Sequence, residues 1–151
     1  MLEPYRRKVH YYETDQMGIV HHANYARWFE EARLHYMDQV GLSYGSMEQW
    51  GVLSPVLFCT CTFKRPLRFP EEFTVDVRLK NFSGVRFAVD YKIYAGEEKV
   101  LAAFGETGHC FANTSMQPIR LQSGYPELYA RMLALMPGEE QKKENVDAEG
   151  V

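Results

Sequence analysis

The stretch YYETDQMGIVHHANYARWFEEAR, from Tyr11 to Arg33, combines an acidic residue, a glycine, two histidines and a helical pattern. Asp15 stands ahead of a turn at Gly18, and the histidines come just before the helical pattern. A strand that ends, turns at glycine and leads into a helix would account for the stretch in structural terms. A second hypothesis is that the carboxylate and the start of the helix form two halves of one catalytic site.

The residues that follow predict an amphipathic helix. Large apolar side chains recur at helical spacing and are opposed by charged ones. Gly41 is a natural stop, and capping preference alone favours Asn24 as the N-cap. The apolar positions are Tyr25, Trp28, Phe29, Ala32, Tyr36 and Val40. So broad an aromatic stripe needs an apolar surface to cover it, such as the face of a sheet.

Four later segments have the pattern of antiparallel strands. They span residues 52–63, 73–82, 85–94 and 99–111. The first is apolar enough to be buried on both faces. The second and third alternate apolar and polar residues around a turn at Ser83 and Gly84. The last contains Gly105 and Gly108, which predict a bulge or a close backbone approach.

The order of the segments predicts one α+β domain over residues 1–137. A first strand is expected at 5–12 and a short final helix at 125–136. The chain has 151 residues, of which 46% are hydrophobic, so it can bury a sizeable core. The tail at 138–151 has few apolar residues and many charges, which predicts disorder. We expect an antiparallel sheet wrapped around one long helix.

Charge and cysteine content narrow the class of function. A net charge of -3 gives no general attraction to nucleic acids or anionic membranes. No secretory signal is evident and no uncharged apolar run reaches about 18 residues, so we expect a cytoplasmic protein. Cys59 and Cys61 are expected to be reduced, packed thiols. Asp15, His21 and His22 are not expected to hold a metal, because adjacent histidines rarely point at one ion.

A carboxylate beside a helix start suits acyl transfer. The first N–H groups of a helix lack partners and carry about half a positive charge, so they stabilise a developing oxyanion. Asp15 could attack an acyl carbonyl or activate a water, while amides near His22 hold the carbonyl oxygen. A thioester fits best, because a thiol with a pKa of about 8.5 leaves without a general acid. The alternative is that Asp15 only caps its turn.

This run closely resembles the hotdog-fold acyl-CoA thioesterases of the YbgC and 4-hydroxybenzoyl-CoA thioesterase type. The matching residues are Asp15, Gly18, Ile19, Val20, His22, Ala23, Asn24 and Tyr25, followed by residues 27–33. The resemblance implies a hotdog fold that pairs into homodimers and often into homotetramers. It also implies hydrolysis of acyl-CoA to a free acid and coenzyme A, without a further cofactor. The acyl group would be short to medium in length or aromatic.

The resemblance also implies roles for single residues. It places the catalytic carboxylate at Asp15 and the oxyanion-holding amide at His22, which requires a helix start earlier than Asn24. Glu31 matches a recurrent acidic position that we interpret as structural. Three further positions match residues that line or shape the substrate site, namely Gly18, Val20 and Tyr25.

Basic residues for the coenzyme phosphates are sparse. Some relatives carry a basic cluster between their third and fourth strands, where this chain offers only Lys80, Ser83 and Arg86 as candidate coenzyme A contacts. An acyl carrier protein therefore stays open as the acyl donor. Arg65 and Arg68 are interpreted either as a solvated strand end or as an anion contact.

Two other functions stay open. A hotdog enoyl-thioester hydratase or dehydratase needs an aspartate and a histidine spaced for proton transfer, but the Asp-x4-His pattern associated with it is absent around Asp15 and His22. A non-catalytic acyl-binding module would keep the fold and release no thiol. His109 and Cys110 are neighbours on a strand and face opposite sides, so they are interpreted as packing residues.

Overall fold

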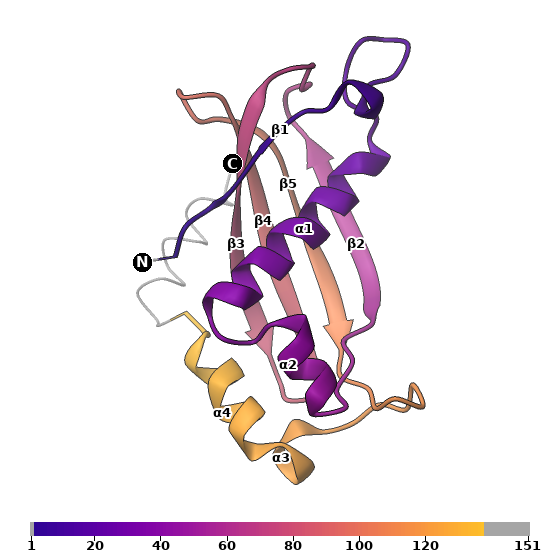
Figure 1. Cartoon of the computed structure of the whole chain (residues 1–151), viewed down its shortest axis with the longest axis vertical. Coiled ribbons are helices and arrows are strands. Elements are labelled where there is room, and N and C mark those ends of the chain that lie inside the picture. The colour runs from indigo at the N-terminus through magenta and orange to yellow at the C-terminus, as the bar shows by residue number, and fades with distance from the viewer. Residues whose placement is uncertain (1, 138–151) are drawn as a thin grey trace.

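The structure, a computed structural model, describes residues 2–137 and is one antiparallel sheet with helix α1 lying across a face (Figure 1). The strands, in the spatial order β1-β3-β4-β5-β2, are β1 Tyr5–Lys8, β2 Val56–Phe63, β3 Glu72–Phe82, β4 Arg86–Ala95 and β5 Val100–Cys110. The helices are α1 Ala23–Gln39, α2 Tyr44–Gln49, α3 Leu121–Gly124 and α4 Pro126–Ala134, with a 3-10 turn η1 at Tyr11–Glu13. This arrangement confirms the predicted α+β hotdog fold.

Helix α1 buries its aromatic stripe against the sheet. Trp28 and Phe29 are both 0% exposed. Phe29 stacks on Tyr91 of β4 with ring centroids 4.3 Å apart, and Trp28 meets Phe73 of β3 at the same separation. Burying each large side chain contributes about 1.5–3 kcal/mol, so this stripe fixes the position of α1 over the sheet.

The glycines of β5 lie where neighbouring groups approach closely. A Cβ at Gly105 would collide with the carbonyl oxygen of Thr60 and the ring of Phe29. A Cβ at Gly108 would collide with the ring of Phe58. The predicted close approach at both glycines is confirmed, and it lets β2 and α1 pack tightly on β5.

Strand β2 differs from its prediction. It begins at Val56, lies at the edge of the sheet and is largely exposed, whereas we expected burial on both faces. Its side chains at Leu57, Phe58 and Phe63 are between 46% and 50% exposed. Cys59 is exposed as well, so the prediction of a packed thiol is wrong for this residue. An apolar run of residues does not reveal whether the strand lies inside the sheet or at its edge, where one side has no neighbouring strand in the same chain.

The start of α1 also differs from the capping preference. His22 is the N-cap, not Asn24, whose side-chain amide instead donates to the Glu13 carbonyl at 2.9 Å. Asn24 is buried, so this bond satisfies a group that would otherwise be costly to hide. The earlier helix start implied by the family resemblance is therefore the observed one.

Smaller differences concern the ends of elements. The first strand stops at Lys8 because the chain turns in η1, and helix α2 was not predicted. The final helix predicted at 125–136 is observed as α4, and the short helix α3 before it was not predicted. The tail at 138–151, predicted to be disordered, lies outside the described residues. Among residues 2–137, no helix is long and apolar enough to cross a membrane.

Candidate functional site

A tight hairpin carries Asp15 to the start of α1. The Asp15 N–H donates to the Ile19 carbonyl at 2.9 Å, and the His21 N–H donates to the Glu13 carbonyl at 2.9 Å. Gly18 near the tip has a φ of +75°, which glycine adopts without strain. The hairpin therefore holds Asp15 opposite Ile19, directly ahead of the helix.

The Asp15 carboxylate is partly exposed and only partly engaged. Its Oδ1 accepts the Met17 N–H at 2.8 Å, so the residue does cap its own turn. Within the described part of the chain, the second carboxylate oxygen has no hydrogen-bond partner. Asp15 thus closes the turn with one oxygen and presents the other.

The start of α1 leaves one amide free. The Asn24 N–H donates to the His21 carbonyl at 3.0 Å, and the Ala23 N–H faces the His21 ring nitrogen Nδ1 at 3.1 Å. Across residues 2–137 the N–H of His22 has no acceptor. The rings of His21 and His22 are exposed and stacked, with centroids 4.3 Å apart. An unpaired donor at a helix N-terminus lies in a positive electrostatic potential, which suits it to an anionic oxygen.

Glu13 is a buried residue whose hydrogen bonds connect the hairpin to β1 and α1. It is 3% exposed. Its Oε1 accepts from the His10 N–H at 2.7 Å and from Arg7 Nη1 at 2.6 Å, and its Oε2 accepts from Trp28 Nε1 at 2.9 Å. Burial raises the pKa of Glu13, but these three donors outweigh it, and the pKa lies below its ordinary value.

Sequence reasoning missed Glu13 because its donors come from three separate elements, and no local spacing brings them together. Arg7 extends the network, since its Nε meets Glu31 at 2.9 Å. The Tyr5 hydroxyl also donates to Glu31, at 2.8 Å. Glu31 therefore lies in a supporting network that joins β1 to α1.

The three positions implied to shape the substrate site are mostly covered in the single chain. Val20 is 4% exposed, and its N–H donates to the Leu67 carbonyl at 2.8 Å. Tyr25 is 3% exposed and meets Phe63 of β2 edge-on, at a centroid separation of 4.8 Å. Burial raises the pKa of Tyr25 to about 12. Gly18 is exposed, and its carbonyl accepts from Arg68 Nη1 at 3.4 Å.

The candidate coenzyme contacts are not brought to Asp15 within one chain. The turn between β3 and β4 lies at the opposite end of the sheet from the hairpin (Figure 1). Lys80 meets Glu106 at 2.9 Å, and the Ser83 hydroxyl accepts the Arg86 N–H at 3.1 Å. Arg68, by contrast, does contact the hairpin, at the Gly18 carbonyl.

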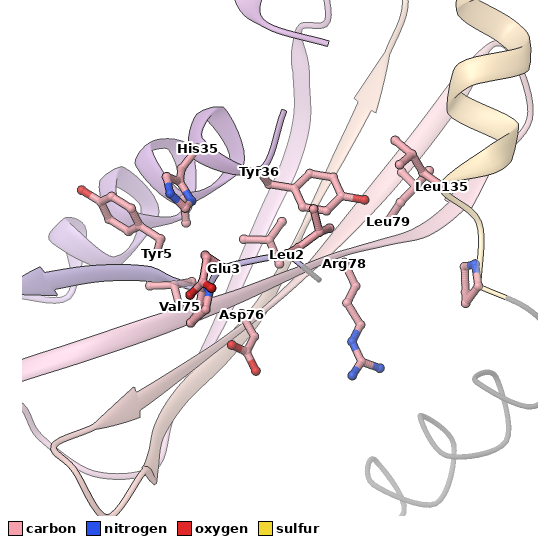
Figure 2. A pocket seen from close by; sticks show the side chains of 14 residues that line it. Leu2, Glu3, Tyr5, His35, Tyr36, Val75, Asp76, Arg78, Leu79 and Leu135 are labelled. Atoms are coloured by element: carbon pink, nitrogen blue, oxygen red, sulfur yellow. The ribbon is translucent and has the colours of Figure 1, made fainter. Parts of the chain in front are cut away.

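A separate cavity of about 460 Å³ lies between the N-terminal segment, α1, β3 and the end of α4. Figure 2 shows Tyr36 of α1 and Leu79 of β3 on the side of the cavity towards Leu135. None of the predicted site residues lines it. In the region that the structure describes, no three histidine, cysteine or acidic groups gather as metal ligands would.

Comparisons with known proteins place these features in a family. A family model described as the thioesterase-like superfamily matches residues 9–137. The Bacillus subtilis protein named "Putative acyl-CoA thioesterase YneP" is 37% identical over 122 residues, which cover 80% of this chain and 87% of the relative. The crystal structure of DHNA-CoA thioesterase from Staphylococcus aureus matches with a TM-score of 0.79 and 32% identity, over 98% of this chain and 94% of that one. The hypothetical protein TT1821 from Thermus thermophilus also matches with a TM-score of 0.79, at 34% identity, over 90% of this chain and 98% of that one.

Proposed function

The chain belongs to the thioesterase-like superfamily, and we propose that it hydrolyses acyl-CoA thioesters through Asp15 and the N–H of His22. The observation that supports these roles is the hairpin, which joins a carboxylate with a free oxygen to a helix start with a free amide. Serial hydrogen bonds along the hairpin restrict both groups, which lowers the entropic cost of bringing them to a substrate.

The proposed reaction uses the two groups on opposite sides of one carbon. The His22 N–H donates to the thioester oxygen, which gains negative charge as the carbonyl carbon is attacked. Asp15 accepts a proton from the attacking water, or attacks first and is itself freed by water. The new C–O bond forms, the C–S bond breaks, and the coenzyme leaves as a thiolate that takes up a proton. The acid product retains the new oxygen.

The names of the relatives support coenzyme A thioesters as substrates. We propose that the acyl group is short to medium in length or aromatic. For the coenzyme phosphates we propose Arg68 ahead of Lys80 and Arg86. Arg68 touches the Asp15 hairpin through the Gly18 carbonyl, whereas the amine of Lys80 is already held by Glu106. An acyl carrier protein as acyl donor would use the same carboxylate and amide.

The first experiment measures thiol release from acyl-CoAs ranging from acetyl to decanoyl and benzoyl. Asp15→Asn should reduce kcat by about a thousandfold or more while leaving the thermal unfolding midpoint unchanged, because only the free carboxylate oxygen is lost. Hydrolysis by the variant at an undiminished rate would contradict the role of Asp15. Absence of thiol release by the unmodified protein, on both coenzyme A and acyl carrier protein substrates, would contradict the activity itself.

A second experiment isolates the amide from the imidazole. His22 has a φ of -55°, which proline can adopt, so His22→Pro removes the N–H with little change of backbone. We expect His22→Pro to reduce kcat by about a hundredfold or more, the cost of removing one oxyanion donor. His22→Ala retains the amide and should keep most of the activity. Ala23→Pro is the matched control, because it removes an N–H that already faces the His21 ring.

A further inference from the structure

Arg33 is a cation that lacks an anion. It is one of two half-buried arginines in the part of the chain that the structure describes, and the other, Arg7, meets two carboxylates. Among residues 2–137 no acidic side chain lies within ion-pair distance of Arg33. Its Nη1 donates to the hydroxyl of Tyr91 at 3.0 Å, which is a neutral partner. A guanidinium has five N–H donors, so most of its capacity remains.

The surroundings of Arg33 are polar but uncharged. The Tyr91 hydroxyl shares a hydrogen bond of 2.7 Å with Thr107, and Thr107 shares one of 2.8 Å with His109. Burial and the charge of Arg33 together lower the pKa of His109 to about 4, so this imidazole is neutral at neutral pH. A partly desolvated cation beside neutral groups is costly unless an anion joins it.

Arg33 lies on the side of α1 that faces the exposed edge strand. Burial raises the pKa of the Cys59 thiol, and the positive charge of Arg33 opposes this rise, so the two side chains are near one another. Cys59 pairs with Thr107 in the sheet. Towards the start of the helix, Tyr25 meets Phe63 on the same strand. Helix α1 crosses the end of β2 near the helix start, and the two elements diverge from there (Figure 1). Arg33 comes eight residues after Tyr25 on this helix.

The spacing suits one substrate. Tyr25 and Arg33 are eight positions apart, which is about 12 Å along a helix axis. The same step on β2, from Phe63 to Cys59, is four positions, or about 13 Å. Along this length β2 turns Phe63, Cys61 and Cys59 to the same face, since alternate residues of a strand point the same way, and none of these side chains is an acid or a base that is charged at neutral pH. An acyl chain would pass along this face from the thioester end to the guanidinium.

We propose that Arg33, with the Tyr91 hydroxyl, binds a carboxylate at the far end of the acyl group, so that the protein prefers acyl-CoAs with an ω-carboxylate over neutral acyl-CoAs of equal length. This inference rests on the proposed function, and it identifies the class of acyl group for that site. The guanidinium would contribute charge-assisted hydrogen bonds in place of its missing ion pair. The uncharged face of β2 would accept the methylene chain between the two polar ends.

The test compares matched pairs of substrates: hexanoyl-, octanoyl- and decanoyl-CoA against hexanedioyl-, octanedioyl- and decanedioyl-CoA. We expect kcat/KM to be about tenfold or more higher for the ω-carboxy member of the best pair, as one charge-assisted hydrogen bond predicts. Arg33→Met should abolish this preference and leave the neutral member within about threefold. Arg27→Met, an exposed arginine on the same helix, is the matched control and should retain the preference.

A binding measurement separates this proposal from the proposed function. Titration calorimetry with non-hydrolysable thioether analogues of octanoyl- and octanedioyl-CoA reports the same preference even if no thiol is released. Tyr91→Phe removes one hydroxyl, changes packing little, and should weaken binding of the ω-carboxy analogue alone. Equal binding of the two analogues by the unmodified protein would overturn the proposal. An unchanged preference in a folded Arg33→Met variant would also overturn the proposal. Dissociation of the protomers in Arg33→Met would overturn it as well, because Arg33 would then pair with an acidic residue of another protomer.

Discussion

Glu13 is a buried residue whose hydrogen bonds join the elements around the proposed site. Its carboxylate accepts from Arg7, His10 and Trp28, while its carbonyl accepts from Asn24 and from the His21 N–H. These bonds connect β1, the hairpin and α1. The position of the free amide at the helix start therefore depends on a buried carboxylate two residues before Asp15.

Replacing Glu13 by glutamine should unfold the protein more easily. The side-chain amide nitrogen of glutamine can only donate, so the variant side chain could not accept from Arg7, His10 and Trp28 together, and Arg7 would keep only the partly exposed Glu31 as an ion-pair partner. Because a buried donor would lose its acceptor, we expect Glu13→Gln to lower the free energy of unfolding by about 3 kcal/mol. Chemical denaturation at pH 7 measures this free energy of unfolding. Glu31→Gln is the control, since Glu31 meets the same Arg7 but its side chain is 39% exposed. Its cost should be at most about 1 kcal/mol. Equal costs for the two variants would contradict the role given to burial.

His109 makes stability depend on pH. Burial, followed by the charge of Arg33, lowers the pKa of His109 from 6.5 to about 4. Between these values the unfolded chain takes up a proton that the folded chain does not. The stabilisation is therefore complete above pH 6.5 and declines as the pH falls towards 4.

Denaturation at several pH values between 4 and 7 should show this decline in the unmodified protein. His109→Gln cannot titrate, so its curve should be flatter over the same range. His10→Gln is the comparison, because it changes an exposed histidine and leaves the buried imidazole in place. A slope that persists unchanged in His109→Gln would assign the pH dependence to another group.

Among the elements, β5 depends on two glycines that leave room for its neighbours. Gly105→Ala should destabilise the fold by about 1–3 kcal/mol, because the new Cβ meets the Thr60 carbonyl and the Phe29 ring. Backbone and a packed ring cannot move away freely. Gly124→Ala in α3 meets no atom within 4 Å and should change stability little. Thermal unfolding of both variants measures the difference, and a neutral Gly105→Ala would show that the sheet relaxes around the methyl group.

The sequence predicts those elements whose residues carry a strong local pattern. Alternation identified β3 and β4, and helical spacing identified the buried stripe of α1 from Trp28 and Phe29. It could not identify His22 as the N-cap, because Asn24 has the better capping side chain and was drawn instead to the Glu13 carbonyl. The family motif identified Asp15 and the His22 amide as candidates, but the hairpin that carries them to the helix start follows from the fold.

Contacts between residues that are distant in sequence could not be predicted from the sequence. The chain from Arg33 through Tyr91 and Thr107 to His109 spans α1, β4 and β5, and no spacing along the sequence connects it. Sequence patterns record which faces are apolar. They do not record which polar groups meet inside, because strand register decides that.

For the whole molecule, the exposed edge of β2 bears on the expected homodimer or homotetramer. A long apolar edge strand exposes unpaired backbone groups as well as side chains, and natural proteins usually cover such edges. We propose that β2 of one protomer pairs with β2 of another, which would cover the exposed Val56, Leu57 and Phe58. The same contact would enclose the space between α1 and β2 in which we place the acyl group.

A single charge should disrupt this assembly. Leu57→Lys places two ammonium groups at a paired edge, so we expect the dimer to dissociate at micromolar protein concentration and kcat/KM to fall by about tenfold or more, since the acyl site would lose a wall. Leu133→Lys is the matched control, because the two leucines are 50% and 51% exposed and Leu133 lies on α4. Sedimentation velocity and thiol release should be measured on the same samples. If Leu57→Lys sediments as the unmodified protein does, β2 is not the interface, and if it becomes monomeric with full activity, the acyl site lies within one protomer.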